Sequence, residues 1–284
     1  MSITKNWDWE ISPQKKISFS FIKSVYEYRH LLSALVRKDF LLNYQQTILG
    51  PLWIFFQPVL TLIVYVLVFG KLIGIPTGEA VPPVLFYFSG IVLWNFFNDA
   101  LWGISNTFRD HIHLYSKVYF PRIIVPLSVL STSFLRFLIQ LALLVLLILY
   151  YVLFKSFPAI SIFNLLALPV ILAGLAMMTT GLGLFAALLS ARYRDLTNLI
   201  GIMLRLLMFV TPVLYPLAAV KPELKWVVLS NPLTPLFEWF RLAMLGSGSV
   251  NDQLLIYSFS FGILVFIISI ILFNRRSGKL IDVS

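Results

Sequence analysis

The sequence predicts an all-helical integral membrane protein with six transmembrane helices. Of its 284 residues, 59% are hydrophobic and 12% are charged, about half of the charge that a soluble protein usually carries. Its mean hydropathy is +0.89. Mainly apolar stretches of about 20 residues, the length that crosses a bilayer, recur along the chain. This composition excludes both a soluble globular domain and a disordered chain.

The N-terminal part of the chain is predicted to lie outside the spans. Residues 1–20 form a polar extension without an apolar core near Met1, so we expect no cleavable signal peptide. Residues 21–45 predict an amphipathic interface helix, because apolar side chains recur at steps of three and four while most basic ones lie off that stripe. Such a helix either lies in the headgroup plane, with its basic side toward anionic lipid, or packs against protein.

The transmembrane domain is predicted to occupy residues 46–284. Six apolar stretches lie within it, and no connector between them is long enough for a soluble domain. The predicted spans cover about residues 52–70, 84–104, 127–153, 162–188, 198–217 and 254–273.

The segment before the last span does not have the pattern of an ordinary loop. Residues 226–245 contain two short apolar stretches, neither long enough to cross a bilayer. They are separated by Asn231-Pro232 and Thr234-Pro235, and a residue that precedes proline avoids the helical region. We therefore expect a re-entrant helical hairpin, with a flat interfacial helix as the alternative.

Basic residues predict the orientation. If the N-terminus is cytoplasmic, the inner segments hold fifteen Lys and Arg residues and the outer segments hold five. The outer five are Lys71, Lys155, Lys221, Lys225 and Arg241. Because cytoplasmic flanks of spans are enriched in Lys and Arg, we expect both termini on the cytoplasmic side. The same enrichment accounts for the net charge of +10 without a nucleic-acid partner.

Residues that could carry catalysis are scarce. The chain has no cysteine, which excludes disulfides and thiolate chemistry. His111 and His113 are two residues apart, so on a helix they point to different sides and cannot share a metal. No G-x-x-x-x-G-K-[ST] phosphate loop is present. We predict no catalytic residue, metal or cofactor in this chain, and any ATP-driven work must take its energy from a separate subunit.

Polar residues inside the spans fall on helical stripes. They are Asn95, Asn98, Asp99 and Trp102 in the second span, Ser128, Thr132, Arg136 and Gln140 in the third, and Asn198 and Arg205 in the fifth. Polar groups are costly in hydrocarbon and usually face the interior of the bundle. Two interpretations remain open: the stripes line or gate a polar route, or Asp99 pairs with Arg136 or Arg205 and holds the helices together.

Four segments together resemble the membrane subunit of ABC-2-type exporters. They are KDFLLNYQQTILGPLWIFFQP at 38–58, KVYFPRIIVPLS at 117–128, ARYRDL at 191–196 and NPLTPLFEWFR at 231–241. The resemblance covers about residues 25–275. It is strongest for the branch that exports O-antigen, capsule and teichoic-acid polysaccharides.

This resemblance implies a partner set and a location. Two copies of the chain would form one channel in the inner membrane, above two cytoplasmic ABC ATPase subunits that hold ATP and Mg²⁺. The substrate would be a lipid-linked, O-antigen-like polysaccharide that moves out of the cytoplasm. Alternatives are export of teichoic acid, a drug or a simple lipid, and more remotely a secondary transporter or a membrane enzyme.

A channel formed by two copies needs lining residues from like spans around the symmetry axis. We expect these to come from the first, second and fifth spans and from the hairpin, with aromatic rings on which sugars slide. The lining candidates are Trp53, Phe56, Tyr65, Asn95, Asp99, Trp102, Arg205, Tyr215 and Trp239. The resemblance further implies that short cytoplasmic segments contact the ATPase. The candidates for that contact are Arg37, Lys38, Arg109, His113, Lys117, Arg192, Arg194 and Asp195.

Overall fold

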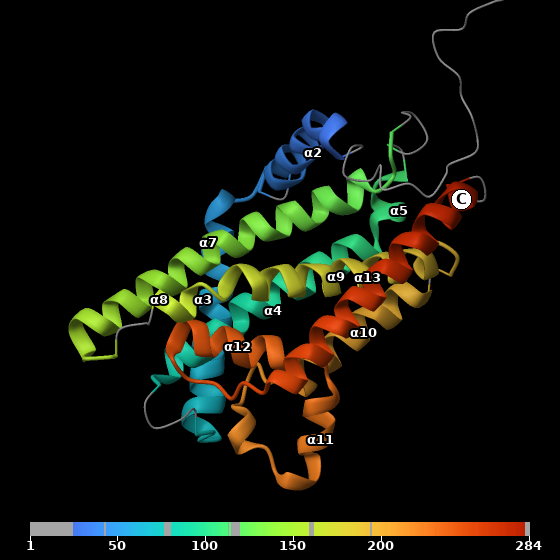
Figure 1. The fold of residues 1–284 in the computed structure, drawn as a ribbon. Coiled ribbons are helices and arrows are strands. Elements are labelled where there is room, and N and C mark those ends of the chain that lie inside the picture. The colour runs from blue at the N-terminus through green and yellow to red at the C-terminus, as the bar shows by residue number, and fades with distance from the viewer. Residues whose placement is uncertain are drawn as a thin grey trace, which may run out of the picture.

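The computed structural model describes residues 25–42, 44–76, 81–112, 114, 120–158, 162–193 and 195–281. Regular secondary structure in these ranges is entirely helical, as predicted (Figure 1). The polar extension predicted for residues 1–20 lies outside them. The predicted interface helix appears as α2 (Arg29–Leu42), preceded by a helical turn from Val25.

Five helices in the described ranges are long and apolar enough to cross a membrane. The first combines η1 (Gly50–Leu52), α3 (Trp53–Tyr65) and the π-helical turn η2 (Val66–Leu72), and the others are α4 (Pro83–Ser105), α7 (Ile124–Lys155), α9 (Leu168–Ser190) and α13 (Asp252–Ile281). Shorter helices connect them: α5 (Thr107–Asp110), α8 (Ile162–Leu165), α10 (Asp195–Val210), η3 (Leu217–Ala219), α11 (Pro222–Ser230) and α12 (Thr234–Leu245).

A sixth continuous transmembrane helix is not confirmed. The stretch predicted over 198–217 forms α10, which has 16 residues and ends at Val210. At 1.5 Å per residue such a helix is about 24 Å long, shorter than the hydrocarbon core of about 30 Å. The helix ends there because Thr211 precedes Pro212, and a residue in that position avoids helical angles.

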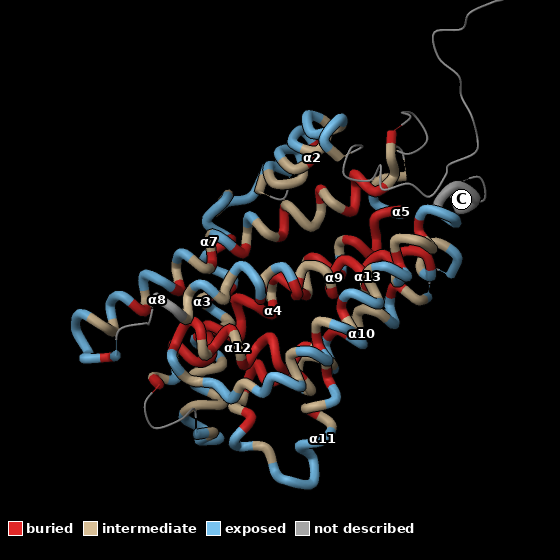
Figure 2. Tube along the Cα trace, viewed as in Figure 1, coloured by how far each residue is buried: buried red, intermediate tan, exposed pale blue. Residues whose placement is uncertain are grey.

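Helix α4 forms the centre of the molecule. In its most apolar stretch 78% of the residues are buried, against 17% in the span that contains α3 and 22% in α7. It packs against α7, α9 and α12, and most of its residues are buried (Figure 2). Its phenylalanines belong to the hydrophobic core. Helix α13 runs along α9, and Gly181 permits this, because a Cβ there would lie 2.7 Å from the Phe266 nitrogen. The apolar surfaces of α3, α7 and α13 remain outside this core.

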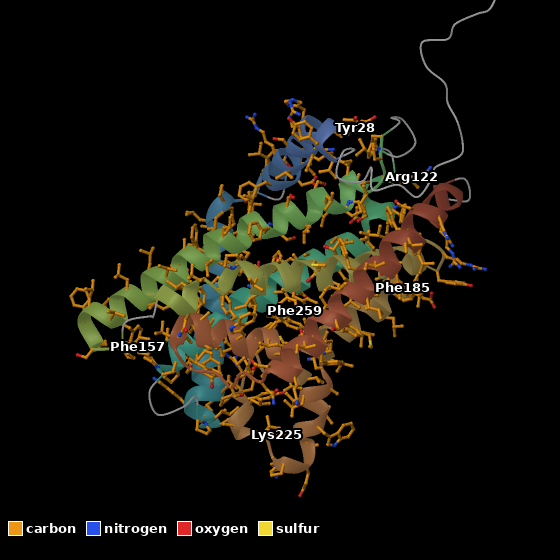
Figure 3. The ribbon with its side chains drawn as sticks, in the orientation of Figure 1. Tyr28, Arg122, Phe157, Phe185, Lys225 and Phe259 are labelled. Carbon is orange, nitrogen blue, oxygen red and sulfur yellow. The ribbon has the colours of Figure 1, made fainter. Side chains whose placement is uncertain are left out.

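Helix α2 packs against protein along one face. Leu35 is buried with Phe120, which precedes α7, and with Ile124 and Val125 in the first turn of α7. The opposite face is exposed. Of the two placements considered for this helix, packing against protein therefore describes one of its faces. Tyr28 and Arg122 lie at the end of the molecule that holds α2, α5 and the C-terminal end of α13, whereas Lys225 of α11 lies at the other end (Figure 3).

Candidate functional site

The polar stripes of the second and third predicted spans face each other. Arg136 Nη1 of α7 lies 3.9 Å from Asp99 Oδ2 of α4, with the two side chains 22% and 40% exposed. The Asn98 amide donates to Asp99 Oδ1 at 3.3 Å. Of the two cations that the sequence offered to Asp99, the structure therefore places Arg136 beside it. Arg205 lies on an exposed face of α10.

Three further side chains complete this α4–α7 polar cluster, which we define as Tyr44, Asn95, Asp99, Arg136 and Gln140. One helical turn from the ion pair, the Asn95 amide donates to Gln140 Oε1 at 3.2 Å. The Arg136 guanidinium lies 5.8 Å from the ring centroid of Tyr44, which follows α2. The cluster therefore joins two spans to the connector that leaves the interface helix.

The charge of Arg136 also reaches into α2. Partial burial raises the pKa of Asp39, and its electrostatic interactions with His111, Lys38 and Arg136 oppose that rise. Asp39 belongs to the interface helix and His111 follows α5. The short connectors at this end of the molecule thus share one electrostatic environment with the α4–α7 polar cluster.

A second cluster lies in the broken segment around α12, and the sequence analysis missed it. Glu238 Oε1 and Arg241 Nη1 lie 3.1 Å apart, with both side chains at most 5% exposed. Arg241 Nη2 donates to the Val213 carbonyl at 2.9 Å. Ser249 donates to Glu238 Oε2 from its backbone nitrogen at 3.0 Å and from its hydroxyl at 3.3 Å. We call these four residues the α12 polar cluster.

The position of Arg241 corrects the charge count of the outer segments. That count treats Arg241 as a loop cation, but its guanidinium is buried and lies 4.0 Å from the ring centroid of Phe86. The available signal was the spacing of Glu238 and Arg241, since residues three apart on a helix are neighbours. An acid and a base at that spacing in an apolar helix indicate an internal ion pair.

The Asn-Pro-Leu-Thr-Pro motif connects α11 to α12 through side-chain hydrogen bonds. The Asn231 amide donates to Thr211 Oγ1 at 2.8 Å, and its own Oδ1 accepts from the Leu233 nitrogen at 3.1 Å. Thr234 Oγ1 donates to the Val228 carbonyl at 2.6 Å. Polar side chains thus satisfy backbone groups that the two prolines leave without helical partners.

The lining candidates divide into exposed and packed residues. Trp53 and Phe56 of α3 and Trp102 of α4 are 40–46% exposed, and Trp102 lies against Gly201 of α10. The packed candidates are Tyr65, whose hydroxyl contacts Met208 Sδ at 3.7 Å, Tyr215, which donates to the Phe209 carbonyl at 2.8 Å, and Trp239, whose ring lies 6.3 Å from that of Phe259 on α13 (Figure 3).

The described candidates for ATPase contact lie within α2 and near the ends of α5, α9 and α10. Arg37, Lys38, Arg109, Arg192 and Asp195 are all exposed. The Ser190 hydroxyl donates to the Ser105 carbonyl at 2.7 Å, so the end of α9 is held against the end of α4. This contact brings the connectors that carry Arg109 and Arg192 together. His113, Lys117 and Arg194 lie outside the described residues.

No three His, Cys, Asp or Glu side chains within the described ranges come together as a metal site.

Comparisons with known proteins indicate a transporter. The model of a family described as ABC-2 type transporter matches residues 30–245. The chain is 30% identical over 203 residues to the O-antigen export system permease protein RfbA of Myxococcus xanthus. The aligned residues make up 71% of this chain and 74% of that protein. A protein of the same name from Klebsiella pneumoniae is 23% identical over 254 residues, covering 89% of this chain and 94% of that protein.

Proposed function

We propose that this chain, which belongs to the ABC-2 type transporter family, is the permease subunit of an exporter of lipid-linked, O-antigen-like polysaccharide. The names of its curated relatives support that substrate class over a drug, a simple lipid or teichoic acid. ATP and Mg²⁺ would bind to two separate ATPase subunits on the cytoplasmic side. The membrane is the inner membrane, with both termini cytoplasmic.

The observation that carries the channel proposal is an exposed charge on a spanning surface. Arg205 is exposed on α10 among apolar neighbours such as Ile202 and Leu206. A charged side chain that faces lipid is costly, so this face meets water or protein. Tyr65 of α3 contacts Met208 of α10, so the two helices lie next to each other at this point.

A second copy of the chain would cover part of this surface. Two copies related by a two-fold axis place α3 and α10 of each opposite those of the other. Trp53, Phe56 and Arg205 then line the space between them, where rings can stack against sugars without fixed register. The packed positions of Tyr215 and Trp239 support a role in holding the outer helices rather than a direct contact with the glycan.

The sixth crossing is proposed to be α10 together with the irregular residues that follow it. The hairpin of α11 and α12 would then re-enter the membrane and close the outer end. Irregular backbone at membrane depth is tolerated only where protein covers it, and α12 meets that requirement because ten of its twelve residues are buried.

The end of the molecule with α2, α5 and the α9–α10 turn is proposed to contact the ATPase. Exposed Arg37, Lys38, Arg109, Arg192 and Asp195 would contact its surface. Through Tyr44 and Arg136, a motion of α2 would reach α4 and α7. The remaining candidates, His113, Lys117 and Arg194, are proposed for the same contact on sequence grounds alone.

The test is transport by the reconstituted complex. The chain is purified with its ATPase, placed in liposomes that contain a lipid-linked polysaccharide, and supplied with ATP and Mg²⁺. We expect ATP-dependent movement of the glycan across the bilayer. A catalytically inactive ATPase variant is the control. ATP hydrolysis without glycan movement would contradict the substrate proposal, and absence of any co-purifying ATPase would contradict the permease role.

A further inference from the structure

The α12 polar cluster lies where the chain changes direction three times. The first turn follows α10 at Thr211, the second precedes α12 at Asn231, and the third follows α12 at Gly246, whose φ of +68° favours glycine. Side chains cross-connect all three turns. Arg241 reaches the first through the Val213 carbonyl, and Glu238 reaches the third through Ser249.

Helix α4 leaves room for this arrangement. A Cβ on Gly90 would lie 2.7 Å from the Val213 carbonyl oxygen and 3.2 Å from Arg241 Nη2. The absence of a side chain at position 90 therefore allows the broken end of α10 and the guanidinium to lie directly against α4. Phe86, one turn away, faces the same guanidinium.

The cluster satisfies a buried carbonyl in the irregular segment that follows α10. Val213 lies beyond the helix end at Val210, outside regular secondary structure, and in a buried site each unpaired group is costly. Arg241 provides a charged donor to the Val213 carbonyl, and such hydrogen bonds are about twice as strong as neutral ones. Both oxygens of Glu238 accept hydrogen bonds. A connected buried network of this kind is rigid.

We propose that Arg241 is a positioning residue that makes the segment following α10, helix α12 and the loop leading to α13 one rigid unit. The inference rests on the proposed export function, because it is during export that α10 would move. A displacement of α10 is then carried directly to α12, so the outer end of the channel opens together with its wall. The opposite behaviour is a latch, in which α12 separates from α10 in each cycle.

Cross-linking distinguishes a rigid unit from a latch. The chain contains no cysteine, so a Thr211→Cys, Asn231→Cys pair is unique, and the side chains at these positions lie 2.8 Å apart. The pair is joined by mild oxidation to a disulfide, or by a short reagent with two thiol-reactive groups, in the complete complex. We expect ATP-dependent glycan export to be unchanged. If the link stops export while ATP hydrolysis continues, the two elements must separate and the proposal is wrong.

A rescue experiment tests Arg241 itself. We expect Arg241→Gln to lower export about tenfold or more, because it leaves Glu238 buried without its counter-charge. The cross-link between positions 211 and 231 should restore export, since it holds the same two elements together. Lys225→Gln on exposed α11 is the matched control and should have no effect. Loss of export that the link does not restore would contradict the positioning role.

Loss of folding and loss of transport are distinguishable. If Arg241→Gln does not accumulate in the membrane, the link should restore its accumulation, and failure to do so also counts against the proposal. If the unmodified complex hydrolyses ATP but moves no glycan, the proposed function fails. In that case, the rigid-unit proposal is tested by whether the cross-link between positions 211 and 231 restores the melting temperature of Arg241→Gln.

Discussion

Two ion pairs among the described residues, Glu238–Arg241 and Asp99–Arg136, use the same chemical groups in different surroundings. Glu238 and Arg241 are 3.1 Å apart, almost fully buried, and further bonded to Val213 and Ser249. Asp99 and Arg136 are 3.9 Å apart and partly exposed, and Arg136 also lies near Tyr44. A buried pair with further hydrogen bonds fixes geometry, whereas a longer, partly exposed pair is weaker and can change partners. We infer that the first holds helices in place and the second lies where helices move.

The largest effect is expected from breaking the buried pair. Arg241→Gln should lower the free energy of unfolding by about 3–5 kcal/mol, because a buried carboxylate then lacks its cation. Thermal unfolding of the purified subunit in detergent measures this, with Glu223→Gln on exposed α11 as the control. Equal melting temperatures for Arg241→Gln and the wild type would show that the two pairs do not differ.

A smaller effect is expected from filling the space beside the guanidinium. Gly90→Ala should cost about 1–3 kcal/mol, as overpacking of a tight interior site does. Gly262→Ala is the control, because a Cβ there meets its nearest neighbour at an ordinary 3.5 Å. The comparison uses the same unfolding measurement. A stability loss equal to that of the control would mean that α4 is not shaped for Arg241.

The partly exposed pair should contribute about 1 kcal/mol or less to stability. A double-mutant cycle with Asp99→Asn and Arg136→Gln measures the coupling between the two side chains. We expect a clearer effect on function, with ATP hydrolysis retained and glycan export reduced. A coupling as large as that of Glu238 and Arg241 would remove the distinction between the two regions.

The smallest effect is expected in the pH dependence of stability that Asp39, near the α4–α7 polar cluster, contributes. Burial raises the pKa of Asp39 above its ordinary value of 3.8, so the folded protein binds this proton more readily than the unfolded chain. The contribution of Asp39 to stability therefore improves as the pH falls from the raised pKa toward 3.8. Subtracting the unfolding data of Asp39→Asn from those of the wild type isolates this change. A difference that falls with decreasing pH would contradict the assignment.

The sequence predicted the α4–α7 polar cluster better than the α12 polar cluster for a physical reason. Asp99 and Arg136 lie on helical stripes within long spans, and polar groups in neighbouring spans turn toward each other. The partner of Arg241 beyond its own helix is a backbone carbonyl at Val213, which no side-chain pattern records. That contact exists only because Pro212 ends α10 early and α12 folds back over Gly90.

The boundaries of the spans show the same difference between what the sequence pattern predicts and what it does not. Hydropathy located the four spans near α3, α4, α7 and α13 to within a few residues, because length and apolar composition determine them. It extended the fifth to residue 217 because the residues after Val210 are still mainly apolar, although their backbone is irregular. Trp239, one of the lining candidates, packs on Phe259, and an aromatic pattern does not distinguish a ring in a channel from one in a core.

We propose that the exposed face of α10 lines a water-filled route while that of α7 faces lipid, and a pair of single cysteines tests this difference. Ile202 on α10 is 52% exposed and Leu146 on α7 is 61% exposed, so the two positions differ mainly in the helix that carries them. Each is replaced by Cys in the complete complex and treated with a charged, water-soluble thiol reagent. We predict rapid labelling at position 202, slowed while glycan is in transit, and negligible labelling at position 146. Equal labelling, or labelling at position 146 alone, would contradict the account.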